Sequence, residues 1–174
     1  SMHIPSNKKV VCITGSVWTG SRVAPRRMLV KDGFLRPTWF TTGRPVTDAE
    51  YRHVSEAQCH LTNAEKNVLV HIEYAGGFVG VMREDFESAM VNAEKGVLVV
   101  GPPEIAAQLA ATIPQAIIFS IKSAGMDLSE YGEAAHRAGQ LHRIDVDVLE
   151  PGGWITVYRS MMDIIGFPVR DHPF

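Results

Sequence analysis

Three short runs of this chain are apolar throughout, and they constrain its fold more than any other feature. The runs are Val10–Thr14 (VVCIT), Val97–Val100 (VLVV) and Ala116–Ile121 (AIIFSI), and helix-length segments separate them. A strand that is apolar on both faces suits a parallel sheet covered by helices on both sides, whereas a half-exposed strand alternates. The sequence therefore predicts an α/β fold in which three layers form, with a parallel sheet between two layers of helices.

Shorter patterns predict the remaining elements. Ser55 is expected to cap a helix, and Gly76-Gly77 to join two strands in a hairpin. Arg83–Lys95 has the apolar spacing of a helix, and Gly96 is expected to end it as the C′ residue. Other elements are expected at Thr38–Thr42, Tyr51–Val54, Pro103–Thr112, Glu130–Leu141 and Ile144–Val148. A last helix from about Gly153 is expected to bury Trp154, Val157, Tyr158, Met161, Ile164 and Ile165.

Length and composition limit the class of protein. The 174 residues fit one domain, in which the more polar stretch from about Arg36 to Met82 is predicted to be a small inserted subdomain. A net charge of −2 gives no basic field for nucleic acid, so we expect no nucleic-acid partner. The longest uncharged stretch, Ile105–Ile121, is too short and too interrupted to span a bilayer, so we expect no membrane partner.

Cysteine and histidine usage indicates a reducing compartment and no metal site. The two cysteines, Cys12 and Cys59, form neither a disulfide framework nor a zinc motif, and the seven histidines show no metal-ligand spacing. Ser1 ahead of Met2 is interpreted as a cloning remnant, and we expect no secretory signal. A cytoplasmic location is therefore expected.

The segment after the first apolar run has the spacing of a phosphate-binding loop. Gly15 and Gly20 bracket four residues between a buried strand and a helix. In such loops backbone N–H groups surround phosphate oxygens, a lysine reaches the outer phosphates, and a Ser or Thr binds magnesium. Here Ser21 occupies the lysine position and Arg22 the hydroxyl position. We take Gly15, Gly20, Ser21 and Arg22 as candidate cofactor-binding residues, and Arg22 as the candidate catalytic residue.

Two further segments give the chain a resemblance to guanylate kinases. Thr41-Thr42-Gly43-Arg44-Pro45, followed by Tyr51-Arg52-His53-Val54-Ser55, is similar to the segment of that family that binds the nucleoside monophosphate. The resemblance covers residues 9 to 121 and implies a P-loop kinase fold of the guanylate kinase type. It also implies a substrate site that includes Thr42, Arg44, Tyr51 and Glu73. ATP and Mg²⁺ would be the cofactors of an active enzyme.

The loop departs from the pattern of the family in ways that weaken ATP binding. Ser21 replaces the lysine, and loss of one such donor costs on the order of 10²–10³ in rate. Pro25 moves the expected helix start to near Ala24, away from the phosphates. Trp18 adds bulk inside the loop, where it is expected to pack as a hydrophobic plug.

The substrate side departs as well. Gly43 and Val46 stand at the positions of two family arginines, which leaves Arg44 as the nearby candidate. The purine-reading glutamate of the family aligns near Val70, with Glu73 three residues away, and the serine after Gly80 becomes Val81. Other departures are Val79 in place of a tyrosine, Gly101-Pro102-Pro103 in place of an acidic pair, and a reduced lid without arginine at Lys122–Gly132.

Three functions remain open at this point. The first is a domain with weak or no kinase activity that binds a small phosphorylated ligand or a protein partner, as the guanylate-kinase domains of scaffold proteins do. The second is a divergent ATP-dependent kinase acting on a nucleoside monophosphate or a small sugar phosphate, with Arg22 or Arg26 replacing the lysine. The third is an α/β domain of unrelated function. A basic stripe of Arg22, Arg26, Arg27 and Lys31 is either a solvated helix face or an anion-binding patch.

Overall fold

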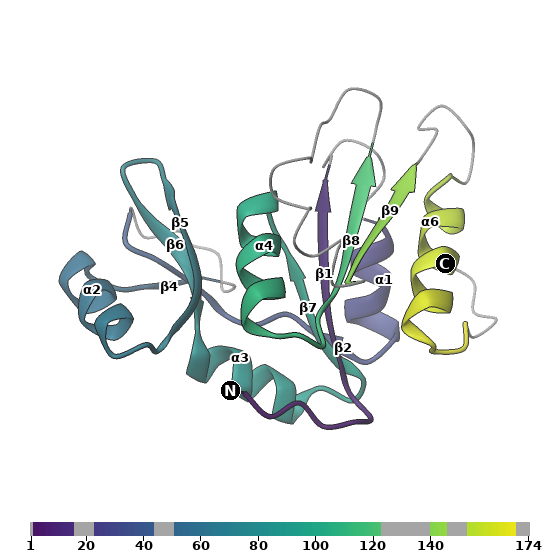
Figure 1. Cartoon of the computed structure of the whole chain (residues 1–174), viewed down its shortest axis with the longest axis horizontal. Helices are drawn as coiled ribbons and strands as arrows, with labels where there is room; N and C mark the ends of the chain where they lie inside the picture. Colours follow the sequence, from purple (N-terminus) through teal and green to yellow (C-terminus); the bar gives the residue numbers. More distant parts are fainter. Residues whose placement is uncertain (1, 16–22, 44–50, 123–139, 146–152, 170–174) are drawn as a thin grey trace.

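The computed structural model describes residues 2–15, 23–43, 51–122, 140–145 and 153–169 (Figure 1). Its centre is a five-stranded sheet in the order β2-β7-β1-β8-β9. Every neighbouring pair in this sheet is parallel, and β1 is the central strand. The predicted parallel sheet is thereby confirmed. Its strands are β1 (Lys9–Gly15), β2 (Phe34–Leu35), β7 (Gly96–Val100), β8 (Ile117–Lys122) and β9 (Leu141–Asp145).

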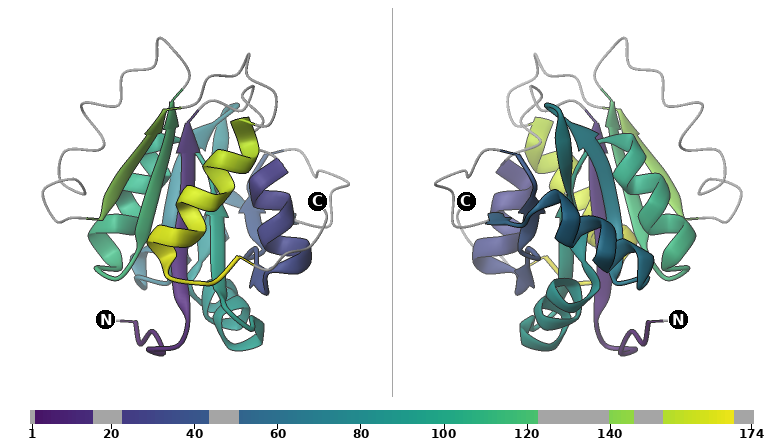
Figure 2. Two further views of the ribbon diagram at one scale, coloured as in Figure 1. Left: turned by 90° about the vertical axis from the view of Figure 1, so that its right-hand side faces the viewer. Right: turned by 90° about the vertical axis from the view of Figure 1, so that its left-hand side faces the viewer.

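Helices cover both faces of this sheet, as the uniformly apolar strands predict. Val11 and Ile13 of β1 point to one face, where they pack with α1 (Val23–Lys31) and α6 (Gly153–Ile165). Val10 and Cys12 point to the other face, toward α3 (Arg83–Asn92) and α4 (Pro103–Thr112). The two views in Figure 2 show the helical layers on either side of the sheet. Among the residues that the structure describes, no helix combines the length and apolar character needed to cross a bilayer.

A second sheet of four strands lies beside the first, in the order β4-β3-β6-β5. Its outer face packs on α2 (Glu56–Ala64) through Phe40, Cys59 and Met82. Its inner face joins the main core through Val70 and Val81. The strands are β3 (Trp39–Thr41), β4 (Tyr51–His53), β5 (Val68–Tyr74) and β6 (Gly77–Met82), and the predicted hairpin is β5–β6.

Helix α4 connects the two sheets through an unusual use of one side chain. The Gln108 amide donates to the His71 carbonyl oxygen at 2.7 Å and accepts from the His71 N–H at 2.8 Å. Since β5 is an edge strand of its sheet, the amide takes the place that a neighbouring strand would fill. Gln108 thus fixes the second sheet on the first through two hydrogen bonds.

Several predicted boundaries are confirmed at the level of single residues. The Ser55 side chain caps α2 by accepting a hydrogen bond from the Gln58 N–H at 3.0 Å. Helix α4 spans Pro103–Thr112 as expected. Helix α1 begins at Val23, close to the expected start near Ala24, because Pro25 is tolerated in a first helical turn.

Other predictions are wrong. Gly96 does not end a helix: α3 ends at Asn92, and Gly96 begins β7 with φ +154°, where a Cβ would clash with the Lys9 carbonyl oxygen. Leu141 lies in β9 instead of a helix. Ile164 is 40% exposed although it was expected to be buried, because the buried stripe of α6 runs through Met162.

The predicted basic stripe on α1 also includes one residue that is not on the surface. Arg27 is buried at 5% exposure, and its guanidinium lies 5.0 Å from the centre of the Tyr158 ring. The Tyr158 hydroxyl donates to the Asp32 carboxylate at 2.6 Å, so a cation, a ring and a carboxylate join α1 to α6. Arg27 therefore belongs to the packing between helices, while Arg26 is exposed on α1.

Candidate functional site

Strand β1 ends in a backbone conformation that only glycine tolerates. Gly15 has φ +125°, and a Cβ at this position would clash with the Ile121 carbonyl oxygen of β8. Gly15 is therefore required where the predicted loop leaves the sheet. The other predicted loop residues, Gly20, Ser21 and Arg22, lie outside the described residues, as does Trp18. Their roles stay predictions.

The end of β7 carries a close backbone approach in place of acidic side chains. The Gly101 N–H donates to the Ile13 carbonyl oxygen at 3.2 Å. A Cβ on Gly101 would lie 3.2 Å from the Ile105 side chain and 3.5 Å from the Trp39 ring, so a larger residue would be crowded here. Pro102 caps α4 without a side-chain hydrogen bond. In the described part of the chain, no group of three or more His, Cys, Asp or Glu residues is arranged to hold a metal ion.

The inner face of the four-stranded sheet holds the predicted substrate residue Tyr51. Tyr51 pairs with Trp39 and His53 with Thr41, so these four side chains share one face. Tyr51 is 36% exposed. Trp39 extends from this face to Gly101, which places Tyr51 on the side of the sheet that faces the core.

Thr42 and Glu73, two further predicted substrate residues, lie around Phe78. The Thr42 hydroxyl accepts a hydrogen bond from the Phe78 N–H at 2.8 Å, and the Thr42 N–H donates to the Phe78 carbonyl oxygen at 2.9 Å. Glu73 is the cross-strand partner of Phe78 and is exposed. Because Val79 shares a face with Thr41, Phe78 and Glu73 point to the opposite face from Tyr51.

The structure therefore does not bring all the predicted substrate residues together. Tyr51 lies on the inner face, Glu73 lies on the outer face, and the Thr42 hydroxyl is engaged with backbone at the end of β3. Arg44, the fourth predicted residue, lies outside the described residues.

Val70 and Val81, which the resemblance places at or near the base-reading positions of guanylate kinases, are part of the core. Val70 and Val81 are cross-strand partners, with exposures of 1% and 0%. Both belong to the apolar cluster that includes Ile105 and Leu109 of α4. A purine edge is recognised through hydrogen bonds, and these two side chains offer none.

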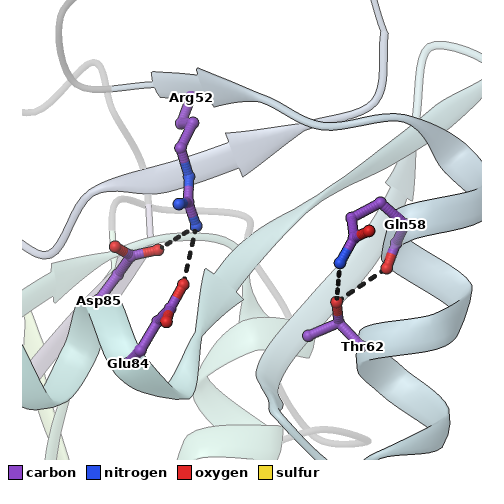
Figure 3. A network of polar contacts seen from close by, with 5 residues as sticks. All are labelled: Arg52, Gln58, Thr62, Glu84 and Asp85. Carbon is purple, nitrogen blue, oxygen red and sulfur yellow. Dashed lines mark hydrogen bonds and ion pairs between the residues drawn. The ribbon is translucent and has the colours of Figure 1, made fainter.

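An ion-pair cluster that the sequence did not single out ties β4 to α3 (Figure 3). The Arg52 guanidinium lies 2.8 Å from the Asp85 carboxylate and 3.5 Å from that of Glu84. Burial raises the pKa of Asp85 above its ordinary value, and the neighbouring Arg52 charge opposes part of that rise. The sequence feature that could have indicated this cluster is the pair of acidic residues in the first turn of α3. Their partner, Arg52, could be recognised only from the position of β4.

Comparison with known proteins rests on structure. No protein-family model matches the sequence, and no curated protein sequence matches it significantly. The structure is similar to that of guanylate kinase from Anaplasma phagocytophilum, with a TM-score of 0.61 over 94% of this chain and 87% of that one. The chain has a guanylate-kinase-like fold. The sequence identity is 13%, at which the guanylate-kinase-like architecture is shared and function has to be argued from side chains.

Proposed function

We propose that this guanylate-kinase-like domain binds a small phosphorylated ligand that lacks a purine base, and that it transfers phosphoryl groups weakly or not at all. The observation that carries the proposal is the buried Val70–Val81 pair. A ligand base at this place would have to displace the packing of β5 and β6 on α4 without gaining a hydrogen bond. A sugar phosphate needs no such contact.

The carboxyl end of β1 supports an anionic ligand. In open parallel sheets, ligands bind beyond the carboxyl ends of the strands, where the strand order reverses. The chain runs from β1 to one side through β2 and β7, and then crosses to β8 and β9 on the other side. Gly15 lies at this reversal, at the start of the predicted phosphate-binding loop, where its positive φ lets the chain pass close to the Ile121 carbonyl oxygen.

The residues present favour binding over transfer. Phosphoryl transfer depends on a magnesium ion and on cations that neutralise the developing charge. Ser21 stands where the lysine is expected, and Gly101 and Pro102 stand where the acidic pair is expected. ATP and Mg²⁺ would therefore bind more weakly than in a working kinase.

Calorimetry with ribose 5-phosphate, GMP and magnesium-ATP tests the proposal. We expect ribose 5-phosphate to bind, GMP to bind no more than about tenfold tighter because its base adds little, and magnesium-ATP to bind weakest. Arg44→Ala should weaken binding about 30-fold, which corresponds to about 2 kcal/mol for a lost charged hydrogen bond. Tyr51→Phe should weaken it several-fold.

Tyr74→Phe is the matched control, because Tyr74 is exposed on the same hairpin sheet and has no proposed role. GMP binding a hundredfold tighter than ribose 5-phosphate would show that a base is read after all. If no phosphorylated compound binds, the anionic ligand is wrong, and a protein partner becomes the better explanation.

A further inference from the structure

Two buried hydroxyl groups near the carboxyl ends of β1 and β8 carry an inference beyond the general ligand class. Thr14 is 5% exposed and Ser120 is 0% exposed. Neither hydroxyl has a hydrogen-bond partner among the residues that the structure describes. Buried side-chain hydroxyls in native proteins nearly always have one, and each exception calls for an explanation such as a bound ligand or water.

The two hydroxyls are direct neighbours. Thr14 and Ser120 are cross-strand partners in the parallel pair β1–β8, so both point to the same face of the sheet. Neighbouring strands lie about 4.8 Å apart. A single oxygen atom between two such hydroxyls can accept from both, because each O–H···O contact spans about 2.7 Å.

A cation continues the same row. Arg143 of β9 is the cross-strand partner of Ser120, so the row runs Thr14, Ser120, Arg143 across three adjacent strands. These strands lie side by side, with their carboxyl ends together (Figure 1). Arg143 is exposed on the outermost strand, where its side chain can turn inward along the row. A guanidinium beside two hydroxyl donors suits a tetrahedral oxyanion.

The position of the row in the fold supports a ligand. β1 and β8 are the two strands that flank the reversal in strand order, which is where ligands bind in open α/β sheets. Thr14 also directly precedes Gly15, the start of the predicted loop. On its other side, the Gly101 N–H donates to the Ile13 carbonyl oxygen of β1, and a Cβ on Gly101 would lie 3.5 Å from the ring of Trp39, which pairs with Tyr51.

We propose that Thr14 and Ser120 donate hydrogen bonds to one oxygen of the ligand's phosphoryl group, and that Arg143 pairs with another. This deepens the proposed function and rests on it. It assigns the phosphoryl end of the ligand to the hydroxyl row and leaves the rest of the molecule to the side of Tyr51. In the ligand-free protein the two unpartnered hydroxyls lower the stability of the fold, and the bound phosphoryl oxygen supplies their missing partner.

The test measures binding of inorganic phosphate by calorimetry at fixed ionic strength, together with melting temperature. Thr14→Val and Ser120→Ala should each weaken phosphate binding at least tenfold, and Arg143→Gln about 30-fold. The same hydroxyl deletions should raise the melting temperature of the ligand-free protein by about 2–4 °C, because an unpartnered polar group is removed. If the two hydroxyls had only a structural role, their removal would not raise the melting temperature and weaken phosphate binding at the same time.

Two controls separate these effects. Thr41→Val makes the same chemical change at a buried hydroxyl that accepts from the Gly43 N–H at 3.2 Å, and it should lower the melting temperature. Arg159→Gln removes an exposed arginine of α6 and should leave phosphate binding unchanged. Ser120→Ala is the smaller change and decides the matter if Thr14→Val does not fold.

The outcomes distinguish the two proposals. If the parent binds ribose 5-phosphate and the row variants bind both it and phosphate equally well, the proposed function stands and the row is overturned. A crystal structure with a water molecule bridging Thr14 and Ser120 while phosphate is bound elsewhere also overturns it. If the parent binds no phosphorylated compound, both proposals fail.

Discussion

Replacing Gln108 with leucine removes the connection between α4 and the edge of the four-stranded sheet. The amide makes two hydrogen bonds to the His71 backbone, at 2.7 and 2.8 Å, in a part-buried place. Leucine keeps the size and helix propensity of the residue but leaves the His71 N–H and carbonyl without these partners. Each net hydrogen bond contributes about 1 kcal/mol, and an unpaired buried group costs about 1–3 kcal/mol. We expect Gln108→Leu to destabilise the protein by about 2–4 kcal/mol.

Two measurements check this expectation. The melting temperature should fall by about 6–12 °C, at about 3 °C per kcal/mol for a domain of this size. Amide hydrogen exchange should accelerate at the His71 N–H, which loses its acceptor, and should change less in β1. The second measurement locates the loss at the edge of β5.

Gln58→Leu is the matched control. Gln58 is exposed on α2, and its side-chain amide donates to the Thr62 hydroxyl of the same helix at 3.1 Å (Figure 3). The same substitution there should change stability by no more than about 0.5 kcal/mol. If Gln108→Leu melts like the parent and exchange at His71 is unchanged, then the two hydrogen bonds do not hold the sheets together.

Three further outcomes follow from single sites. Arg52→Ala should lower the free energy of unfolding by up to about 1 kcal/mol near neutral pH. This loss should vanish as the pH falls through the raised pKa of Asp85, because a protonated carboxyl no longer pairs with the cation. Denaturant titrations of both proteins at several pH values check the sign, and a difference in stability that does not change with pH contradicts it. Gly15→Ala should destabilise by about 3 kcal/mol or more, whereas Gly76→Ala, also at positive φ but with open space around it, should cost about 1 kcal/mol in the same denaturant assay. Burial raises the pKa of the Cys12 thiol to about 12, so this thiol should react with a disulfide reagent only at the rate of unfolding, and rapid labelling of the native protein would refute its burial.

Local signals were sufficient for most of the elements. The helix at Pro103–Thr112 and the Ser55 cap depend on residues within a few positions of each other, and both are found where the sequence puts them. Strand β2 was not predicted, because its two residues are too short for any periodicity. Gly96 was misassigned because a glycine after a helix usually ends it, while here the close approach of Lys9 requires a glycine within a strand.

The candidate site depended on contacts that no local pattern contains. The row of Thr14, Ser120 and Arg143 exists only because β1, β8 and β9 are neighbours in a fixed register. The opposite orientations of Tyr51 and Glu73 likewise follow from the pairing of β3, β4, β5 and β6. Sequence reasoning could place residues on strands, but it could not say which strands adjoin.

The buried Val70–Val81 pair has a consequence for how this domain can change. A glutamate at position 70 would put a carboxylate among side chains such as Ile105 and Leu109, and a buried charge without a partner costs several kcal/mol. A lysine introduced at position 21 would not by itself remove this obstacle, because Val70 and Val81 would still belong to the apolar cluster with α4. Packing therefore limits how this domain could come to bind a purine, because the contact between α4 and the hairpin would first have to be rebuilt.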